Sequence, residues 1–292
     1  MRYIMILPGI LALLLVFNPV TNIAHGSGTP SDLMKTTYAP YAALLANFLE
    51  EKDLPGDGLV SAFDYRAALS APDTGELLQQ QRELLSDFDT EQLDNRETAI
   101  AFWLNAYNFF MIEQILEQRP DGELVESVWD YGGRVNPFRD NIFERELFNV
   151  GGQKHSLDGI EKGILLGEQY RQRGWFDARV HFAVNCASVG CPPLRRQLYT
   201  PANVDELMSE NTRRAFNTPR QLRVEEDRLY LTRLFDWYEE HFVTAAGSIR
   251  GFIREYADKE LIEAIEATST IRHINYDWDL NKPANFEEFR KP

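Results

Sequence analysis

Both cysteines of this chain lie close together, beside one of its five histidines. Cys186 and Cys191 follow His181 at intervals of five residues, and Gly190 and the pair Pro192-Pro193 interrupt the segment. Thiols and imidazoles bind metals, attack carbonyl groups or form disulfides, so chemistry is expected near this segment. The residue types indicate where a site lies and leave its reaction open.

Four interpretations of this segment are open. The first is a structural disulfide, because a short span that contains Gly190 can bring two Cα atoms to the ~4.4–6.8 Å that a disulfide requires. The second is a metal site, which the spacing disfavours: five residues turn successive ligands by about 140° on a helix and to opposite faces on a strand. The two-residue cysteine spacing of structural zinc sites is also absent, so we expect no metal and no cofactor.

The third interpretation is a nucleophilic cysteine with a histidine base. If residues 181–186 were extended, His181 would lie about 16 Å from Cys186, and another histidine would have to serve that thiol. The candidates are His155, His241 and His273. Alternatively, Cys191 is the exposed thiol and His181 folds back against it. The fourth interpretation is two small buried thiols with no chemical role.

Two amides form a second candidate group, in the helix that is most strongly predicted, over 98–118. The central turns of this helix are apolar almost all round, which is typical of a helix covered on every side. Asn105 and Asn108 share one face of it, and a buried amide must be hydrogen-bonded or costs ~1–3 kcal/mol. Either both point into a pocket and bind a ligand, with Tyr107 as a further binding residue, or they bond to the backbone of a following loop. The second interpretation is slightly favoured.

Acidic residues form the third group. Asp277, between Tyr276 and Trp278, could orient a histidine or contact a ligand, although an aspartate in such a place more often caps a turn. Ser156 or Asp158 is expected to cap a helix. Asp158 and Glu161 are therefore interpreted first as helix-start residues and second as catalytic acids.

The elements that must position these residues are mixed. Helices are expected over 38–49, 77–85, 98–118, 202–216, 235–242 and 251–265, strands over 180–184, 228–231 and 271–278, and a long ordered loop over 128–152. No internal repeat or long linker divides the chain. We therefore predict one α+β domain over 37–292, after a flexible leader over 27–36. In it, a buried central helix packs against a small, mainly antiparallel sheet.

The first 26 residues predict a signal peptide. Arg2 precedes an apolar run over 4–17, and Ala24-His25-Gly26 offers a cleavage site. A helix of that run is about 21 Å long, which is short of the ~30 Å hydrocarbon core, so we expect no stable membrane anchor after cleavage. Export predicts a periplasmic or extracellular location, where nearby cysteines tend to pair.

The charge of the chain bounds its partners. The formal net charge is −15, and so acidic a protein repels phosphate backbones and anionic lipid surfaces. Nucleic acid is therefore excluded as a partner. A small molecule, or an envelope or peptide ligand, is the class that remains.

Four motifs, in order along the chain, resemble those of the domain of unknown function 547 family. They are Phe102-Trp103-Leu104-Asn105-Ala106-Tyr107-Asn108, Ser156-Leu157-Asp158-Gly159-Ile160-Glu161, the segment from His181 to Pro192, and Tyr276-Asp277-Trp278-Asp279-Leu280-Asn281. Phe63-Asp64-Tyr65 also fits. The resemblance runs over about 41–281, with its core near 95–200, and implies an exported bacterial protein. The activity of the family is not established, so the resemblance implies no reaction.

A looser similarity is to the order of papain-like and transglutaminase-like hydrolases, in which a buried helix precedes a strand that bears a histidine. Those enzymes carry their thiol at the start of the central helix, and here that helix has no cysteine. The similarity therefore does not transfer their mechanism.

These inferences combine into one hypothesis, a pocket between the helix of Asn105 and Asn108 and the Cys186–Cys191 loop. As an enzyme, the protein would be a hydrolase or acyl transferase acting on an envelope or extracellular substrate. His181 would then be the base and Cys186 or Cys191 the nucleophile. The alternative is a non-catalytic ligand-binding or scaffold protein in which the two cysteines form a disulfide.

Overall fold

The computed structural model describes residues 29–132 and 141–290, so the predicted signal peptide over 1–26 lies outside the described residues. The α-helices are α1 (Pro30–Thr37), α2 (Ala39–Phe48), α3 (Tyr65–Ser70), α4 (Thr74–Ser86), α5 (Arg96–Glu117), α6 (Glu168–Gln172), α7 (Val204–Phe216), α8 (Leu234–Trp237), α9 (Glu239–Ala246), α10 (Ile249–Tyr256), α11 (Lys259–Glu266) and α12 (Glu287–Arg290). The strands are β1 (Leu49–Leu54), β2 (Gly58–Phe63), β3 (Phe148–Val150), β4 (Gln153–His155), β5 (Leu222–Glu225), β6 (Arg228–Leu231) and β7 (Thr270–His273). Across the described ranges, none of the helices is both long and apolar enough to cross a bilayer.

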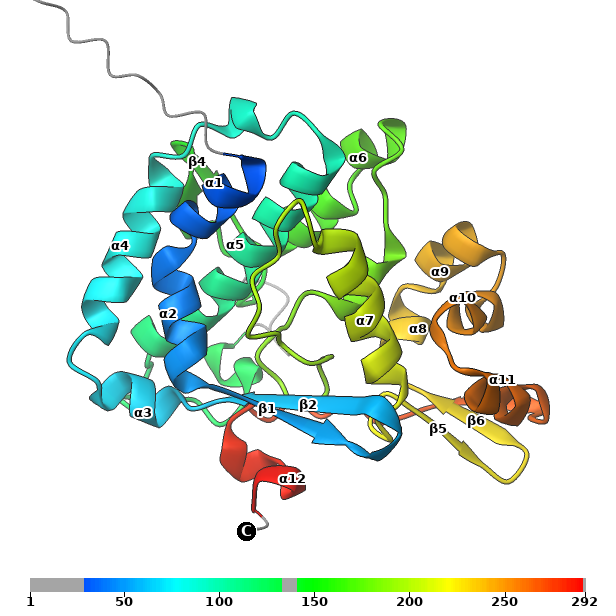
Figure 1. The fold of residues 1–292 in the computed structure, drawn as a ribbon. Helices are drawn as coiled ribbons and strands as arrows, with labels where there is room; N and C mark the ends of the chain where they lie inside the picture. Colours follow the sequence, from blue (N-terminus) through cyan, green and yellow to red (C-terminus); the bar gives the residue numbers. More distant parts are fainter. Residues whose placement is uncertain (1–28, 133–140, 291–292) are drawn as a thin grey trace, which may run out of the picture.

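The central helix forms where its sequence predicts it. The side chain of Asn95 accepts a hydrogen bond from the Thr98 N–H at 2.9 Å and so caps the first turn of α5. Every residue from Thr98 to Leu116 is buried. Figure 1 shows α5 inside the molecule, with α1, α2 and α4 on one side and α7 on another. A helix without a polar face is stable only when it is surrounded in this way.

The strands form three small sheets rather than the one sheet that we expected behind the central helix. β1–β2 and β3–β4 are antiparallel hairpins, and β5–β6–β7 is a three-stranded sheet in which β6 and β7 are parallel. Helices and loops cover most of α5, and β3 adds a strand contact, in which Phe148 stacks on Phe110 with ring centroids 4.5 Å apart. The α+β class is confirmed, but strands of three to six residues are too short to make a covering layer.

Several local expectations were wrong. The run over 180–184 is not a strand but a turn of 3₁₀ helix, η5 (Ala178–Phe182), which the Asp177 side chain caps by accepting from the Arg179 N–H. A short apolar run cannot distinguish these alternatives by its period. The aromatic segment over 235–242 is divided between α8 and α9, and only the start of 271–278 is a strand. The predicted loose leader over 27–36 contains α1, which begins with a capping box at Thr29.

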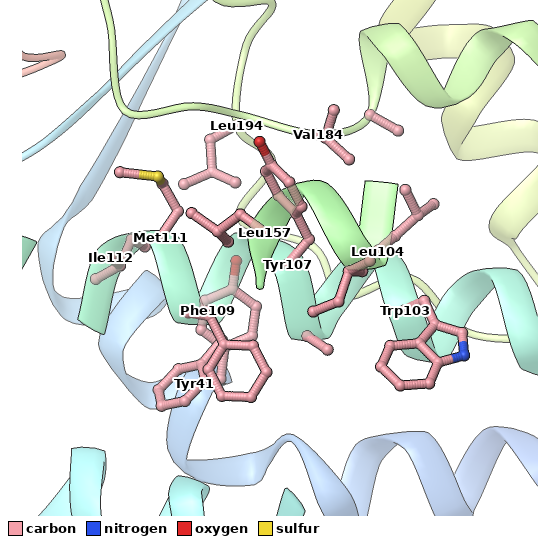
Figure 2. Close-up of a cluster of buried hydrophobic side chains, with 14 of the residues drawn as sticks. Tyr41, Trp103, Leu104, Tyr107, Phe109, Met111, Ile112, Leu157, Val184 and Leu194 are labelled. Atoms are coloured by element: carbon pink, nitrogen blue, oxygen red, sulfur yellow. The ribbon is translucent and has the colours of Figure 1, made fainter. Parts of the chain in front are cut away.

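The side chains gather into two main hydrophobic cores. The first surrounds α5, and the second is built of phenylalanines from η5, α7, α8, α9 and α10. Val180 belongs to the first core and Phe182 to the second, so His181 lies on the boundary between them. Figure 2 shows part of the first core, where Tyr107 extends from α5 toward the loop that carries Val184 and Leu194, whereas Tyr41 and Phe109 lie on the opposite side of the helix.

Candidate functional site

A cavity of about 350 Å³ opens where the two cores meet. Its lining comes from six parts of the chain: Tyr107 of α5; Trp129, Asn141, Phe143 and Glu144; Asp158, Glu161 and Lys162; His181, Val184, Cys186, Cys191 and Pro192; Leu234, Trp237 and Tyr238; and Tyr276 and Trp278. A volume of this size suits a small molecule or the end of a larger chain.

Glu161 reaches the cavity from a π-helical segment, η4 (Gly159–Leu165), which Ser156 caps by accepting from the Gly159 N–H at 2.9 Å. The wide turn brings backbones close together: a Cβ at residue 167 would lie 1.9 Å from the Gly163 carbonyl oxygen, so only glycine fits there. Single π-helical turns occur frequently at functional sites. Ser156 is therefore the cap that we predicted, and Glu161 is also an acid at the cavity.

His181 faces Glu161 inside the cavity. The imidazole is 1% exposed, and its Nδ1 lies 3.6 Å from Oε1 of Glu161, which is beyond hydrogen-bonding distance. Among the described residues this buried nitrogen has no hydrogen-bond partner. The ring of Tyr238 stacks on the imidazole with centroids 4.0 Å apart and fixes its plane.

A second histidine holds the other side of the ring. Nε2 of His181 lies 2.8 Å from Nδ1 of His241, which comes from α9. Burial, and then the neighbouring His181 and Arg171, lower the pKa of His241 to about 4. A neutral His241 can accept the Nε2–H of His181, and that tautomer leaves Nδ1 of His181 as a free lone pair toward the cavity. His241 is one of the three histidines that the sequence offered; His155 lies on β4 against Trp103, and His273 ends β7.

Cys186 and Cys191 form a disulfide, with Cα atoms 6.2 Å apart. Residues 277–281 lie along their loop: the N–H groups of Val189 and Gly190 donate to the carbonyls of Asp279 and Asp277 at 2.9 and 2.8 Å. A Cβ at Gly190 would lie 2.9 Å from that Asp277 oxygen, so the turn requires glycine. Of the four interpretations, the structure shows the first.

The disulfide changes the predicted chemistry. A thiolate is the nucleophilic form of cysteine, and sulfurs bonded to each other supply none. The assignment of Cys186 or Cys191 as nucleophile would therefore hold only for reduced protein. The pair still lines the cavity, and the Tyr276 hydroxyl lies 3.3 Å from each sulfur.

The two amides on α5 hold loops instead of lining the cavity. Asn105 donates to the Tyr199 carbonyl at 2.7 Å and accepts from the Tyr199 N–H at 3.1 Å. Asn108 donates to the Ala183 carbonyl at 2.9 Å and accepts from the Asn185 N–H at 2.8 Å. The expected pocket between the helix and the cysteine loop is present, but both side chains are fully used by backbone groups and neither is among its described lining residues.

The two remaining candidate residues, Tyr107 and Asp277, differ in where the structure places them. Tyr107 lines the cavity, as a ligand-binding residue would. Asp277 does not: its side chain accepts from the Asp279 N–H at 3.0 Å and caps a turn, which is the commoner arrangement for an aspartate at this position.

Sequence reasoning missed an aromatic wall, which we define as Trp237, Tyr238, Tyr276 and Trp278. The rings of three of them contact one another: Trp237 stacks on Trp278 with centroids 5.7 Å apart, and Tyr276 lies 4.5 Å from Trp278. The signal was present in two aromatic segments about forty residues apart, but nothing in the sequence places them together. The same cavity is lined by what we call the acidic wall: Asp158, Glu161, His181 and the disulfide. The two walls touch, since Tyr238 stacks on His181 and the Tyr276 hydroxyl lies 3.3 Å from each sulfur.

The acidic wall does not have the form of a metal site. Across 29–132 and 141–290, the structure brings together no group of three His, Cys, Asp or Glu side chains that could hold a metal ion. The pKa of Asp158 is raised by burial, against the opposing effect of Lys162, whose Nζ lies 2.8 Å from Oδ2 of Asp158.

Fold and site together define an α+β protein with a cavity that has one acidic and one aromatic wall. The model of the family described as "Protein of unknown function, DUF547" matches residues 90–215, so this part of the chain is similar to that family. No curated protein and no solved structure matches the chain. The match includes the whole acidic wall and ends before the aromatic wall begins.

Proposed function

We propose that this protein is a hydrolase in which His181 and Glu161 activate a water molecule for attack on a carbonyl group of a bound ligand. The observation that supports this most directly is Nδ1 of His181, a buried nitrogen that lines the cavity without a hydrogen-bond partner in the described structure. Leaving such an atom unpaired costs ~1–3 kcal/mol, so a donor group that enters the cavity and bonds to it would be stabilised there.

The gap between the two groups suits a water molecule. Nδ1 of His181 and Oε1 of Glu161 lie 3.6 Å apart, and both accept hydrogen bonds when His241 holds the proton of His181 on Nε2. A water molecule has two O–H donors and can bridge two such acceptors. It would then be oriented for reaction before a substrate arrives.

The hydrolytic step follows from this arrangement. The proton of the water passes to Nδ1 of His181 while its oxygen bonds to the carbonyl carbon. The bond to the leaving group then breaks, and the leaving group takes the proton from the imidazolium. Glu161 stabilises the imidazolium during this sequence because its carboxylate is close and shielded from water. No thiol takes part, so hydrolysis is favoured over acyl transfer through an acyl-enzyme.

The test is a panel of chromogenic esters and amides, with wild type compared to Glu161→Gln, which keeps the shape of the side chain. We expect at least a ~100-fold loss of kcat/KM, since general acid–base groups contribute about 10²–10⁴-fold. His155→Gln is the matched control, because His155 lies on β4 outside the cavity. Wild-type turnover that Glu161→Gln retains in full would contradict the proposal.

A second candidate function is ligand binding without catalysis, with the disulfide as a structural link. The disulfide itself favours it, because it leaves the cavity without a thiol. Saturable binding to a protein that turns over no member of the panel would select this function.

We also propose that the protein is exported and acts on an envelope or extracellular substrate. The apolar run over 4–17 supports this, as does the disulfide, because disulfides persist in oxidising compartments. Expression of the full chain in a bacterium, followed by fractionation and intact mass, tests it. We expect a periplasmic or secreted form that lacks residues 1–26, and an uncleaved cytosolic protein would contradict it.

A further inference from the structure

The charges that line the cavity are unbalanced. Among its described lining residues, Glu144, Asp158 and Glu161 are acids and Lys162 is the basic residue, apart from the histidine. Lys162 already pairs with Asp158 at 2.8 Å. Two carboxylates therefore remain without a counter-charge from the described lining, in a site that is partly shielded from water. Glu161 is buried, so its charge is costly until an opposite charge arrives, whereas Glu144 is exposed and adds to the negative potential at the mouth of the cavity.

The aromatic wall lines the same cavity as these charges. Trp237, Tyr276 and Trp278 pack against one another, and Trp237 is 45% exposed although its ring is large and apolar. Rings of this kind attract cations through the negative potential above their faces, and Trp does so most strongly. Carboxylates and indole rings around one hollow are complementary to the same kind of ligand.

A separate observation indicates that the hollow is built for a ligand. Nδ1 of His181 is buried, lines the same cavity and has no hydrogen-bond partner in the described structure. The acidic residues alone would be consistent with a solvated surface. A deeply buried nitrogen without a hydrogen-bond partner is not expected at a solvated surface. We therefore take Nδ1 of His181 to mark the inner end of the cavity, where the reacting part of a ligand would bind.

We propose that the ligand of this cavity carries an ammonium group, which lies against Trp237 and Trp278 and is balanced by Glu144 and Glu161. This rests on the proposed function, because it makes the substrate an ester or amide that carries a separate primary or quaternary ammonium group, with its carbonyl toward His181. An anionic ligand would meet the carboxylates with like charge. A neutral sugar could stack on the rings, but it would desolvate the two acids without compensating their charge.

The experiment titrates wild-type protein with choline and with 3,3-dimethyl-1-butanol, in which a carbon replaces the charged nitrogen. Tryptophan fluorescence reports binding, since Trp129, Trp237 and Trp278 line the cavity, and calorimetry gives the affinity. We expect choline to bind at least about tenfold more tightly than its neutral counterpart, and its affinity to fall as salt is added.

Two variants locate the ammonium. Trp237→Ala removes a half-exposed ring and Glu144→Gln removes one charge at an exposed residue, so both should fold normally. We expect each to weaken choline binding by about threefold to tenfold and to leave the weak binding of the neutral alcohol unchanged. Glu146→Gln is the matched control, because Glu146 is an exposed acid on the same loop that does not line the cavity.

Each outcome separates this inference from the proposed function. Equal affinity for choline and the neutral alcohol, or binding of neutral sugars instead, overturns the ammonium assignment, even if Glu161→Gln abolishes hydrolysis. Selective choline binding that Trp237→Ala and Glu144→Gln weaken supports it, even if the ester panel shows no turnover. A loss that is equally large in Glu146→Gln overturns it, because the effect would then come from overall charge.

Discussion

The two walls of the cavity differ in both chemistry and origin. The acidic wall, from Asp158 to Cys191, carries ionisable groups and the disulfide and lies within the region that matches the family model. The aromatic wall, from Trp237 to Trp278, lies beyond that region and is dominated by large rings. Reaction and recognition are therefore assigned to different parts of the chain, and residues 90–215 alone do not complete the cavity.

The division is not complete, since Tyr238 of the aromatic wall stacks on His181 and Tyr276 contacts the disulfide. Tyr107 adds a ring from α5 to the side of the acids, and His241 reaches from α9 to hydrogen-bond His181. The assignment of reaction to the acidic wall and of ligand recognition to the aromatic wall is therefore a hypothesis that experiments can contradict. The first test asks whether any buried acid of the matched region affects chemistry, or only those at the cavity.

Glu113 provides the largest expected effect. It lies on α5 outside the cavity, and burial raises its pKa to about 7, although a hydrogen bond from Arg82 at 2.8 Å opposes the shift. The folded protein then holds a proton that the unfolded chain has released above pH ~4.5, so stability falls as the pH rises from about 4.5 through 7. The fall should approach about 3 kcal/mol.

Urea unfolding of wild type and Glu113→Gln between pH 4 and 8 measures this dependence. We expect Glu113→Gln to lose most of the slope while its hydrolytic activity stays that of wild type. Glu117→Gln is the control, since Glu117 shares Arg82 but is exposed. A variant that keeps its stability profile but loses activity would show that the acids of the matched region act together, which would break the comparison.

Removing the disulfide shows whether this part of the acidic wall contributes to stability or to activity. Closing so short a loop stabilises the fold by about 2 kcal/mol in the chain-entropy model, so Cys186→Ser with Cys191→Ser should cost about that much. The loop is also held by backbone hydrogen bonds from Val189 and Gly190 to residues 277–279, and we expect hydrolysis to persist. Urea unfolding and the ester panel, each with and without reductant, measure both effects. Activity that appears only after reduction would restore the thiol mechanism.

The secondary structure could be predicted from the sequence where the determining residues lie within one helix or strand. The helix over 98–118 matches α5 within two residues and the strand over 228–231 matches β6, because periodicity and flanking breakers act within one element. The predicted strand over 180–184 was wrong because the buried side chains of this segment pack into two different hydrophobic cores. A run of apolar residues in the sequence does not reveal this.

The site shows the same limit. Sequence reasoning found His181, the cysteines and Tyr107, and the disulfide was one of four interpretations. It named His241 only as one of three histidines, since the pairing depends on how α9 packs against η5. For Asn105 and Asn108 it weighed a place in the pocket against bonding to a loop backbone and slightly favoured the second, but it could not name the loops, whose carbonyls and N–H groups lie about 75 to 95 residues away. Contacts over such separations are set by tertiary packing.

Substitution of His241 has the smallest expected effect on activity. It is a sharp test of the comparison, because His241 comes from the same part of the chain as Trp237 and Tyr238 but hydrogen-bonds to His181 of the acidic wall. His241→Phe keeps a ring but removes the hydrogen bond to Nε2 of His181, so the tautomer with a free Nδ1 is no longer enforced. We expect kcat to fall by about tenfold with KM little changed, since general-base efficiency depends on the position and protonation of the base. His241→Gln, whose amide oxygen can accept the same proton, should recover part of the loss.

The pH dependence of stability distinguishes this role from packing. The pKa of His241 is about 4 in the folded protein, against 6.5 when unperturbed, so the unfolded chain takes up its proton first. Stability from the neutral ring is complete above pH ~6.5 and falls as the pH drops from there toward 4; solvent screening at this half-buried group reduces its size. His181 and Arg171 favour the neutral ring, and Glu161 opposes them. The His241→Phe variant should not show this loss of stability at acid pH. If its kcat is also unchanged, His241 packs beside His181 without positioning it, and the two walls act independently.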